Sequence, residues 1–454
     1  MTLQSINPAT GELIQEFPEL TTEQIEEKLH QAHREFAVWS QVLMKDRKKY
    51  MLRLADILKT RKKELGTLLT QEMGKPITQA VSEVEKCAWV CEYYASETEN
   101  VLQDELINTD ALESFVRFDP LGVIFAIMPW NFAFWQVMRF AVPAVMAGNI
   151  GVLKHASNVP QSAEMIEHLF LEAEFPAGVF QNFLISSSQV EGIIRDSRVA
   201  AVTFTGSEFA GSKVAEEAGS EIKPTVLELG GSDAFIVLDD ADVERACDVA
   251  VMARLQNNGQ SCIAAKRFIV LRKVSQEFLR LLKRRYEVLK IGDPMQEETQ
   301  IGPLATESIR NDLARQVNES VTKGAKVIIG GNRIEGKGFF YTPTILIDIQ
   351  PGMPAYDEEI FGPVAPVIVV EDAEQAIQVA NDTKFGLGAS LWTRNIELAK
   401  AIAKRLQVGS VFINGIVKSD PRLPFGGIKK SGYGRELSHY GMKAFMNIKT
   451  VWIQ

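Results

Sequence analysis

The stretch from residue 121 to residue 155, LGVIFAIMPWNFAFWQVMRFAVPAVMAGNIGVLKH, decides the fold that this sequence predicts. It holds two short apolar runs, 123–127 and 151–154, that read as strands, and between them a longer segment that predicts a helix over 136–147. Strands alternating with helices are typical of a parallel sheet covered by helices on both faces. Such sheets bind ligands at the carboxyl ends of their strands, and Asn131 follows the first of these strands.

The same alternation continues toward the C-terminus. Helices are expected at 160–172, 207–218, 243–257 and 278–289, and strands at 202–204, 234–238 and 268–271. Residues 22–100 predict helices, 114–118 a short strand and the tail 443–453 an extended segment. An extended tail needs a sheet edge to pair with, and a second subunit is one source of such an edge.

Length and composition exclude several classes of protein. Of 454 residues, 46% are hydrophobic and 24% are charged, which is typical of a globular enzyme with two or three domains. A net charge of −9 argues against nucleic acid as a partner. No apolar stretch reaches the ~20 residues that a membrane-spanning helix needs, and the N-terminus does not read as a secretory signal. Four cysteines do not suggest a disulfide framework, which favours the reducing cytoplasm. Together these features predict a cytoplasmic protein with no membrane or nucleic-acid partner.

Three polar residues together point to chemistry at a carbonyl group. Cys262 lies in NNGQSCI (257–263), Glu228 in VLELGG (226–231) and Asn131 in MPWNF (128–132). A thiol, a carboxylate and an amide supply a nucleophile, a base and an oxyanion donor. Each residue also has a structural interpretation, namely a buried cysteine, a charge at a strand end and an asparagine in a turn. The cysteines and histidines show no metal-ligand spacing, so no metal is expected.

Six motifs follow one another in the order found in a known family: Pro-Trp-Asn-Phe at 129–132, Phe-Thr-Gly-Ser at 204–207, Glu-Leu-Gly-Gly at 228–231, Gly-Gln-Ser-Cys at 259–262, Glu-Ile-Phe-Gly-Pro at 359–363 and Pro-Phe-Gly-Gly at 424–427. With them the chain resembles the aldehyde dehydrogenase superfamily over nearly its whole length. The resemblance implies an α/β fold with a Rossmann-like parallel-sheet cofactor domain (1–100 and 119–229), an α/β catalytic domain (230–426) and a small β oligomerisation arm (101–118 and 427–454). It also implies a homodimer or a homotetramer.

The resemblance assigns catalytic roles to the three polar residues. Cys262 matches the nucleophile, Glu228 the general base, and Asn131 the oxyanion donor that acts with the Cys262 backbone amide. The thiolate would add to an aldehyde to give a thiohemiacetal, hydride would leave for a nicotinamide, and Glu228 would activate water to hydrolyse the thioester. Relatives that release acyl-CoA usually lack this glutamate, so its presence favours hydrolysis.

The implied cofactor site lacks the Gly-x-Gly-x-x-Gly fingerprint. Gly206, Ser207 and Gly211 instead open a helix whose N-terminal amides favour a phosphate. Four other residues match the family's cofactor contacts: Trp130, Lys154, Glu359 and Phe361. Of these, Lys154 matches the lysine that reaches the adenosine ribose.

Ser157 bears on the choice between NADP and NAD. NAD-preferring relatives often carry a glutamate three residues after the lysine, where it would repel a 2′-phosphate; this chain has Ser157 there. A hydroxyl beside Lys154 favours a 2′-phosphate, so we expect NADP as the cofactor and NAD as a poorer one. The alternative is that Ser157 only caps the helix that begins near residue 160.

Arg139 gives the expected substrate. At this position the succinate-semialdehyde dehydrogenases carry an arginine that grips the distal carboxylate, and Ser419 matches a serine that adds a hydrogen bond to it. The apolar walls of this substrate site are expected from Phe132, Trp135 and Phe425. The resemblance therefore implies oxidation of succinate semialdehyde to succinate. The alternatives are a structural salt bridge of Arg139, another substrate such as glutarate semialdehyde, and a non-catalytic binding protein on the same fold.

Two positions depart from some succinate-semialdehyde dehydrogenases. A second arginine six residues before the nucleophile is replaced by Gln256, which weakens the substrate assignment. A second cysteine two residues after the nucleophile is replaced by Ala264, which predicts no local disulfide switch at Cys262.

Overall fold

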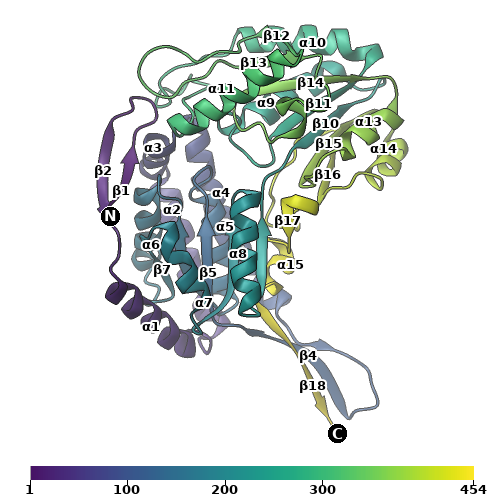
Figure 1. Ribbon diagram of the computed structural model, residues 1–454. Helices are drawn as coiled ribbons and strands as arrows, with labels where there is room; N and C mark the ends of the chain where they lie inside the picture. The colour runs from purple at the N-terminus through teal and green to yellow at the C-terminus, as the bar shows by residue number, and fades with distance from the viewer. Residues whose placement is uncertain (1) are drawn as a thin grey trace.

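The structure is a computed structural model that describes residues 2–454 as two α/β lobes with a narrow β-arm projecting from one of them (Figure 1). The lobe that bears the arm is built on a six-stranded sheet of order β17-β9-β8-β5-β6-β7. Its parallel strands are β5 (Val123–Met128), β6 (Ile150–His155), β7 (Phe180–Asn182), β8 (Val199–Thr205) and β9 (Thr225–Glu228). The short β17 (Gly432–Tyr433) pairs antiparallel with β9.

Helices cover both faces of this sheet, so its central strands are apolar throughout. Every residue of β5 and β6 is buried. All residues of α5 (Trp135–Met146) are buried as well, because it packs between these strands and α4 (Ile77–Val101). The other helices of this lobe are α1 (Thr22–Trp39), α2 (Met44–Thr60), α3 (Lys62–Met73), α6 (Pro160–Glu172), α7 (Val190–Arg195) and α8 (Glu208–Ser220).

The second lobe is built on a seven-stranded sheet of order β12-β13-β14-β11-β10-β15-β16. Its strands are β10 (Asp233–Val237), β11 (Ala265–Leu271), β12 (Lys326–Ile329), β13 (Thr344–Ile347), β14 (Val364–Val370), β15 (Gly388–Trp392) and β16 (Ser410–Ile413). All neighbours run parallel except β12, which is antiparallel to β13. Its helices are α9 (Val243–Leu255), α10 (Arg272–Glu287), α11 (Glu307–Thr322), α12 (Pro354–Asp357), α13 (Ala373–Asn381) and α14 (Ile396–Ala403).

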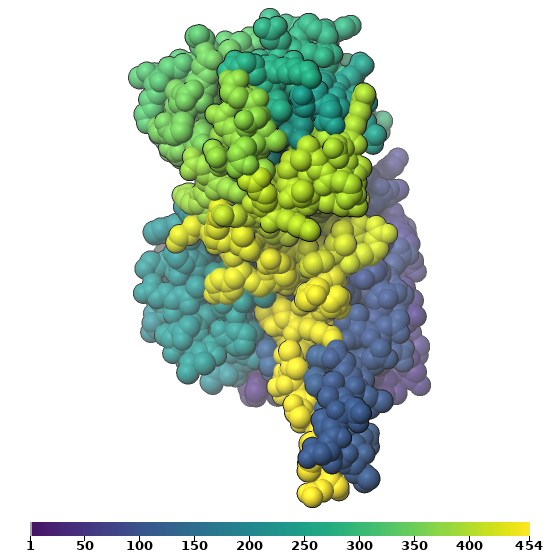
Figure 2. All heavy atoms as spheres, turned by 90° about the vertical axis from the view of Figure 1, so that its right-hand side faces the viewer, coloured from purple at the N-terminus to yellow at the C-terminus, as the bar shows by residue number. Residues whose placement is uncertain are grey.

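The arm is a three-stranded antiparallel sheet of order β18-β4-β3. After α15 (Ser438–Lys443) the chain continues into β18 (Met446–Ile453), which pairs along its full length with β4 (Glu113–Pro120); β3 (Glu105–Leu106) pairs with the other edge of β4. Figure 2 shows the C-terminal strand lying beside this earlier segment at the tip of the molecule. The extended tail is confirmed, and the sheet edge that it pairs with comes from the same chain.

The expected α/β fold is confirmed, with local differences. The helix expected over 243–257 ends at Leu255, because Asn257 and Asn258 take left-handed φ angles of 54° and 57°. An N-terminal hairpin of β1 (Thr2–Ile6) and β2 (Leu13–Pro18) was not foreseen, since β2 is mostly exposed and shows no apolar alternation. Within residues 2–454, no helix combines the length and the apolar character needed to cross a membrane.

Candidate active site

Asn131, Glu228 and Cys262 lie where the two lobes meet. Asn131 follows β5, Glu228 ends β9, and Cys262 lies in the loop between the 3-10 turn Gln256–Gly259 and β11. The Asn131 side-chain amide donates to the Gln260 carbonyl at 3.0 Å. Asn257 donates in turn to the Asn131 carbonyl at 2.6 Å, so the structure holds the proposed oxyanion donor against the loop of the nucleophile.

A second set of contacts fixes this loop to the turn that follows Glu228. Lys266 Nζ donates to the carbonyls of Ser261 and Cys262, both at 2.7 Å, and forms an ion pair with Glu359 at 2.9 Å. Glu359 also accepts from the Gly231 amide at 3.2 Å. A Cβ on Gly231 would lie 2.7 Å from the Cys262 carbonyl oxygen, so this close approach requires glycine.

Cys262 is the one cysteine of the four that is not fully buried. Burial still raises the pKa of its thiol to about 11, although Lys266 and Arg139 act in the opposite direction. At neutral pH the thiol is therefore protonated, and formation of the thiolate requires a base.

Glu228 is buried without a polar partner. Within residues 2–454, neither carboxyl oxygen has a hydrogen-bond partner. Burial raises the pKa of Glu228 well above its usual range, the Glu436 charge raises it further, and Arg139 lowers it. A Cβ on Gly426 would lie 2.5 Å from Glu228 Oε1, so a side chain there would displace the carboxyl.

Arg139 forms an ion pair with Glu436, and both side chains are buried. The structural salt bridge that the sequence left open as an alternative is therefore present. The guanidinium carbon also lies 4.5 Å from the ring centroid of Phe425, whose backbone exchanges two hydrogen bonds of 2.8 Å with Glu436. Arg139 Nη2 has no hydrogen-bond partner within the described residues, so the guanidinium keeps a donor for a ligand.

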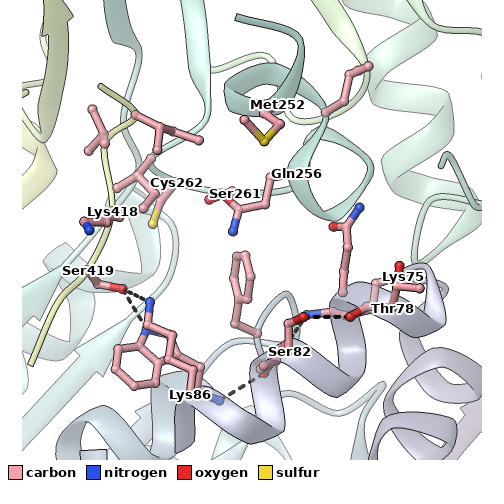
Figure 3. Close-up of a pocket in the computed structure, with 18 of the residues that line it drawn as sticks. Lys75, Thr78, Ser82, Lys86, Met252, Gln256, Ser261, Cys262, Lys418 and Ser419 are labelled. Carbon is pink, nitrogen blue, oxygen red and sulfur yellow. Dashed lines mark hydrogen bonds and ion pairs between the residues drawn. The ribbon is translucent and has the colours of Figure 1, made fainter. Parts of the chain in front are cut away.

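One cavity of about 540 Å³ joins the thiol to the expected substrate residues (Figure 3). The expected substrate residues all contribute to its wall: Phe132, Trp135, Arg139, Ser419 and Phe425. Ser419 Oγ accepts from Trp135 Nε1 at 2.9 Å and from Lys86 Nζ at 2.8 Å. Sequence reasoning missed Lys86, because a lysine on a helix usually lies on a solvated face.

The expected cofactor residues come from both lobes, with Trp130 after β5 and Phe361 before β14. The rings of Trp130 and Phe361 contact each other edge-to-face at 5.8 Å. Ser207 caps the N-terminus of α8, and its side chain accepts from the Ala210 amide at 3.3 Å. A Cβ on Gly211 would lie 2.5 Å from Leu229, so glycine allows α8 to approach this segment.

Lys154 and Ser157 are the residues expected at a 2′-phosphate. Burial lowers the pKa of Lys154, and no carboxylate oxygen within residues 2–454 lies within 4 Å of its ammonium group. Ser157 is exposed after β6 and does not cap α6, since no side chain of the preceding turn makes that hydrogen bond. Glu72 accepts from the Gln161 and Ser162 amides instead, at 2.8 and 2.9 Å. The capping alternative for Ser157 is therefore wrong.

Comparisons with known proteins agree with this arrangement. The family model described as "Aldehyde dehydrogenase family" matches residues 1–451. The chain is 51% identical over 453 residues to a probable succinate-semialdehyde dehydrogenase [NADP(+)] of Synechocystis, and 48% identical over 456 residues to succinate-semialdehyde dehydrogenase [NADP(+)] 1 of Mycobacterium tuberculosis; each match covers 100% of both chains. Among solved structures, succinic semialdehyde dehydrogenase of Streptococcus pyogenes in complex with NADP+ matches with a TM-score of 0.98 and 41% identity over 99% of both chains.

Proposed function

Since the chain belongs to the aldehyde dehydrogenase family, we propose that it oxidises succinate semialdehyde to succinate with NADP as the hydride acceptor. The family model and the fold confirm the membership of this family that six short motifs implied. The observation that carries the substrate assignment is one cavity whose wall contains both the Cys262 thiol and the Arg139 guanidinium. The names of the relatives at 48 and 51% identity support the same assignment.

In the proposed reaction Cys262 Sγ attacks the aldehyde carbon, and its proton leaves to a base. Asn131 and the Cys262 amide stabilise the resulting oxyanion, which costs little reorganisation because the Asn131 loop is held in place. NADP held by Trp130, Glu359 and Phe361 would supply the hydride acceptor that thioester formation requires. Glu228, once ionised, takes a proton from the water that releases succinate.

Lys154 and Ser157 support the choice of NADP. A 2′-phosphate at this place would meet the Lys154 ammonium group, which has no carboxylate oxygen within 4 Å, and the exposed Ser157 hydroxyl. Trp130, Glu359 and Phe361 would hold the nicotinamide half, since the rings of Trp130 and Phe361 contact each other and Glu359 is fixed by its ion pair with Lys266.

The arm supports a homodimer or a homotetramer. β18 forms one edge of its sheet, and several large apolar side chains on the arm are exposed: Leu106, Leu112, Ile448, Trp452 and Ile453. An open strand edge with apolar side chains is typical of an interface between subunits. The mass of the protein in solution tests this proposal, and a monomer would contradict it.

The first experiment measures the absorbance of the reduced cofactor with NADP and with NAD. The substrates are succinate semialdehyde, glutarate semialdehyde and butanal, an uncharged aldehyde of the same chain length as the first. We expect NADP-linked turnover of succinate semialdehyde with a kcat/KM far above that for butanal. Equal kcat/KM values for succinate semialdehyde and butanal would show that Arg139 has only a structural role. A higher kcat/KM for glutarate semialdehyde would make that longer carboxy-aldehyde the substrate instead.

A further inference from the structure

Lys86 lies on the cavity side of α4. In Figure 3 its side chain lies beside Ser419, on the same helix as Thr78 and Ser82, across the cavity from Gln256. Its ammonium group donates to Ser419 Oγ at 2.8 Å and lies 4.0 Å from the ring centroid of Trp135.

Lys86 differs from the other cationic side chains of this cavity in having no acidic partner. Lys75 pairs with Glu83, Arg139 with Glu436, and Lys418 with Asp420. Within residues 2–454, no carboxylate oxygen lies within 4 Å of Lys86 Nζ. Burial and the Arg139 charge lower the pKa of Lys86 to about 8, which is the expected condition of an ammonium group that lacks an anion.

Ser419 also has a hydrogen-bond donor without a partner. A hydroxyl has two acceptor positions and one donor, and here Lys86 and Trp135 each donate to the oxygen. The Ser419 proton is therefore left to donate to another group, and the cavity lies beside it. An ammonium group and a hydroxyl with free donors, side by side on a largely apolar wall, form a site for a carboxylate.

We infer that Lys86 determines substrate specificity by binding, together with Ser419, the distal carboxylate of the substrate. This inference rests on the proposed function, since it assumes a carboxy-aldehyde in the cavity. It also explains how the chain manages with Gln256 where some succinate-semialdehyde dehydrogenases have a second arginine: α4 supplies the second positive charge from another wall of the same cavity.

The test compares Lys86→Met, Lys86→Arg and the wild type, with succinate semialdehyde and butanal as substrates. Losing a charged hydrogen bond should raise the KM for succinate semialdehyde, relative to that for butanal, by about 10- to 100-fold in Lys86→Met. Lys86→Arg keeps the charge and should recover most of the ratio. Lys418→Met is the matched control, because Lys418 lies on the same cavity wall with an acidic partner, and its ratio should stay at the wild-type value.

A pH series separates binding from a structural role. In the wild type the KM for succinate semialdehyde should rise above about pH 8, where Lys86 loses its charge. Lys86→Arg should abolish that rise in KM. The comparison of these two pH series tests the proposal even if Lys86→Met does not fold.

The two proposals can fail separately. A wild type that prefers succinate semialdehyde, with an unchanged ratio in Lys86→Met and the same pH rise in Lys86→Arg, overturns only the role of Lys86. A wild type with no preference over butanal overturns the proposed function, and the role of Lys86 with it. In Lys86→Met, equal increases in the KM for succinate semialdehyde and for butanal would mean that Lys86 only positions the Ser419 loop against α4.

Discussion

Arg139, which lines the cavity that contains Cys262, forms a buried ion pair with Glu436 behind the cavity wall. Buried at the same place is Glu228, whose pKa is raised by the Glu436 charge and lowered by Arg139. One guanidinium thus acts on two buried carboxyls, and the residue proposed to bind the substrate also lowers the pKa of the proposed base, against the larger effects of burial and Glu436.

Replacing Arg139 should therefore damage both binding and hydrolysis. In Arg139→Met, Glu436 loses its counter-charge and the pKa of Glu228 rises further, so a smaller fraction of Glu228 is ionised at a given pH. We expect a higher KM for succinate semialdehyde together with a kcat lowered by at least several-fold, since hydrolysis needs the ionised Glu228. Butanal separates the two effects: its kcat should fall as well. An unchanged kcat for butanal would contradict the coupling.

Glu228→Gln should stop the reaction at the thioester. The first turnover needs no water, so a burst of reduced cofactor equal to the enzyme concentration should remain, followed by a steady rate lower by about 10²- to 10⁴-fold. Rapid mixing with absorbance detection measures both phases. The wild-type steady rate should also rise with pH, because the raised pKa of Glu228 keeps the carboxyl neutral at low pH. Loss of both burst and steady rate would place Glu228 in the first step instead.

Local patterns predicted most strands and helices between residues 22 and 289 and the extended tail, and made no prediction for the elements from α11 to β17. The fully buried β5 and β6 are mostly apolar runs of strand length, and α9 ends earlier than expected because Gln256 turns extended and Asn257 and Asn258 are left-handed. β2 was missed because it is mostly exposed and carries no apolar alternation. A strand of that kind is stabilised by its partner β1, which no local pattern shows.

The resemblance named the candidate site residues, and the sequence could not give their partners. Nothing local to Arg139 indicates Glu436, which approaches it only because β17 and the Phe425 backbone return to the first sheet. Lys86 is the clearest case: its helix position suggests a solvated lysine, and only the folded chain places it against Trp135 and Ser419. Distant pairs of this kind decide charge and specificity in the cavity.

Ser157→Glu should reverse the cofactor preference. A carboxylate at this exposed position beside Lys154 would repel a 2′-phosphate and would accept hydrogen bonds from ribose hydroxyls. We expect kcat/KM for NADP to fall by about 10²-fold and that for NAD to rise, from a change of 2–3 kcal/mol in binding. Ser157→Ala is the control, since it removes the hydroxyl without adding charge and should lower NADP use only slightly. An unchanged cofactor preference in Ser157→Glu would contradict the assignment of Ser157 to the 2′-phosphate site.

Glu72 predicts a pH dependence of stability that is separate from the chemistry. It is buried and accepts hydrogen bonds from the first amides of α6, while burial raises its pKa to about 7. Between pH 4.5 and pH 7 the unfolded chain releases this proton and the folded chain keeps it, so the free energy of unfolding should fall as pH rises through this window.

Comparison with Glu72→Gln isolates this contribution. One such group changes the free energy of unfolding by at most about 1.4 kcal/mol per pH unit. Urea denaturation at pH 5, 6, 7 and 8 should therefore show a wild type that loses stability relative to Glu72→Gln up to pH 7 and runs parallel to it above. The variant removes the titration but keeps a side-chain oxygen that can accept one helix amide, so it should remain folded. Parallel curves over the whole range would mean that the α6 amides hold the carboxylate ionised, and that hydrogen bonding outweighs burial at this site.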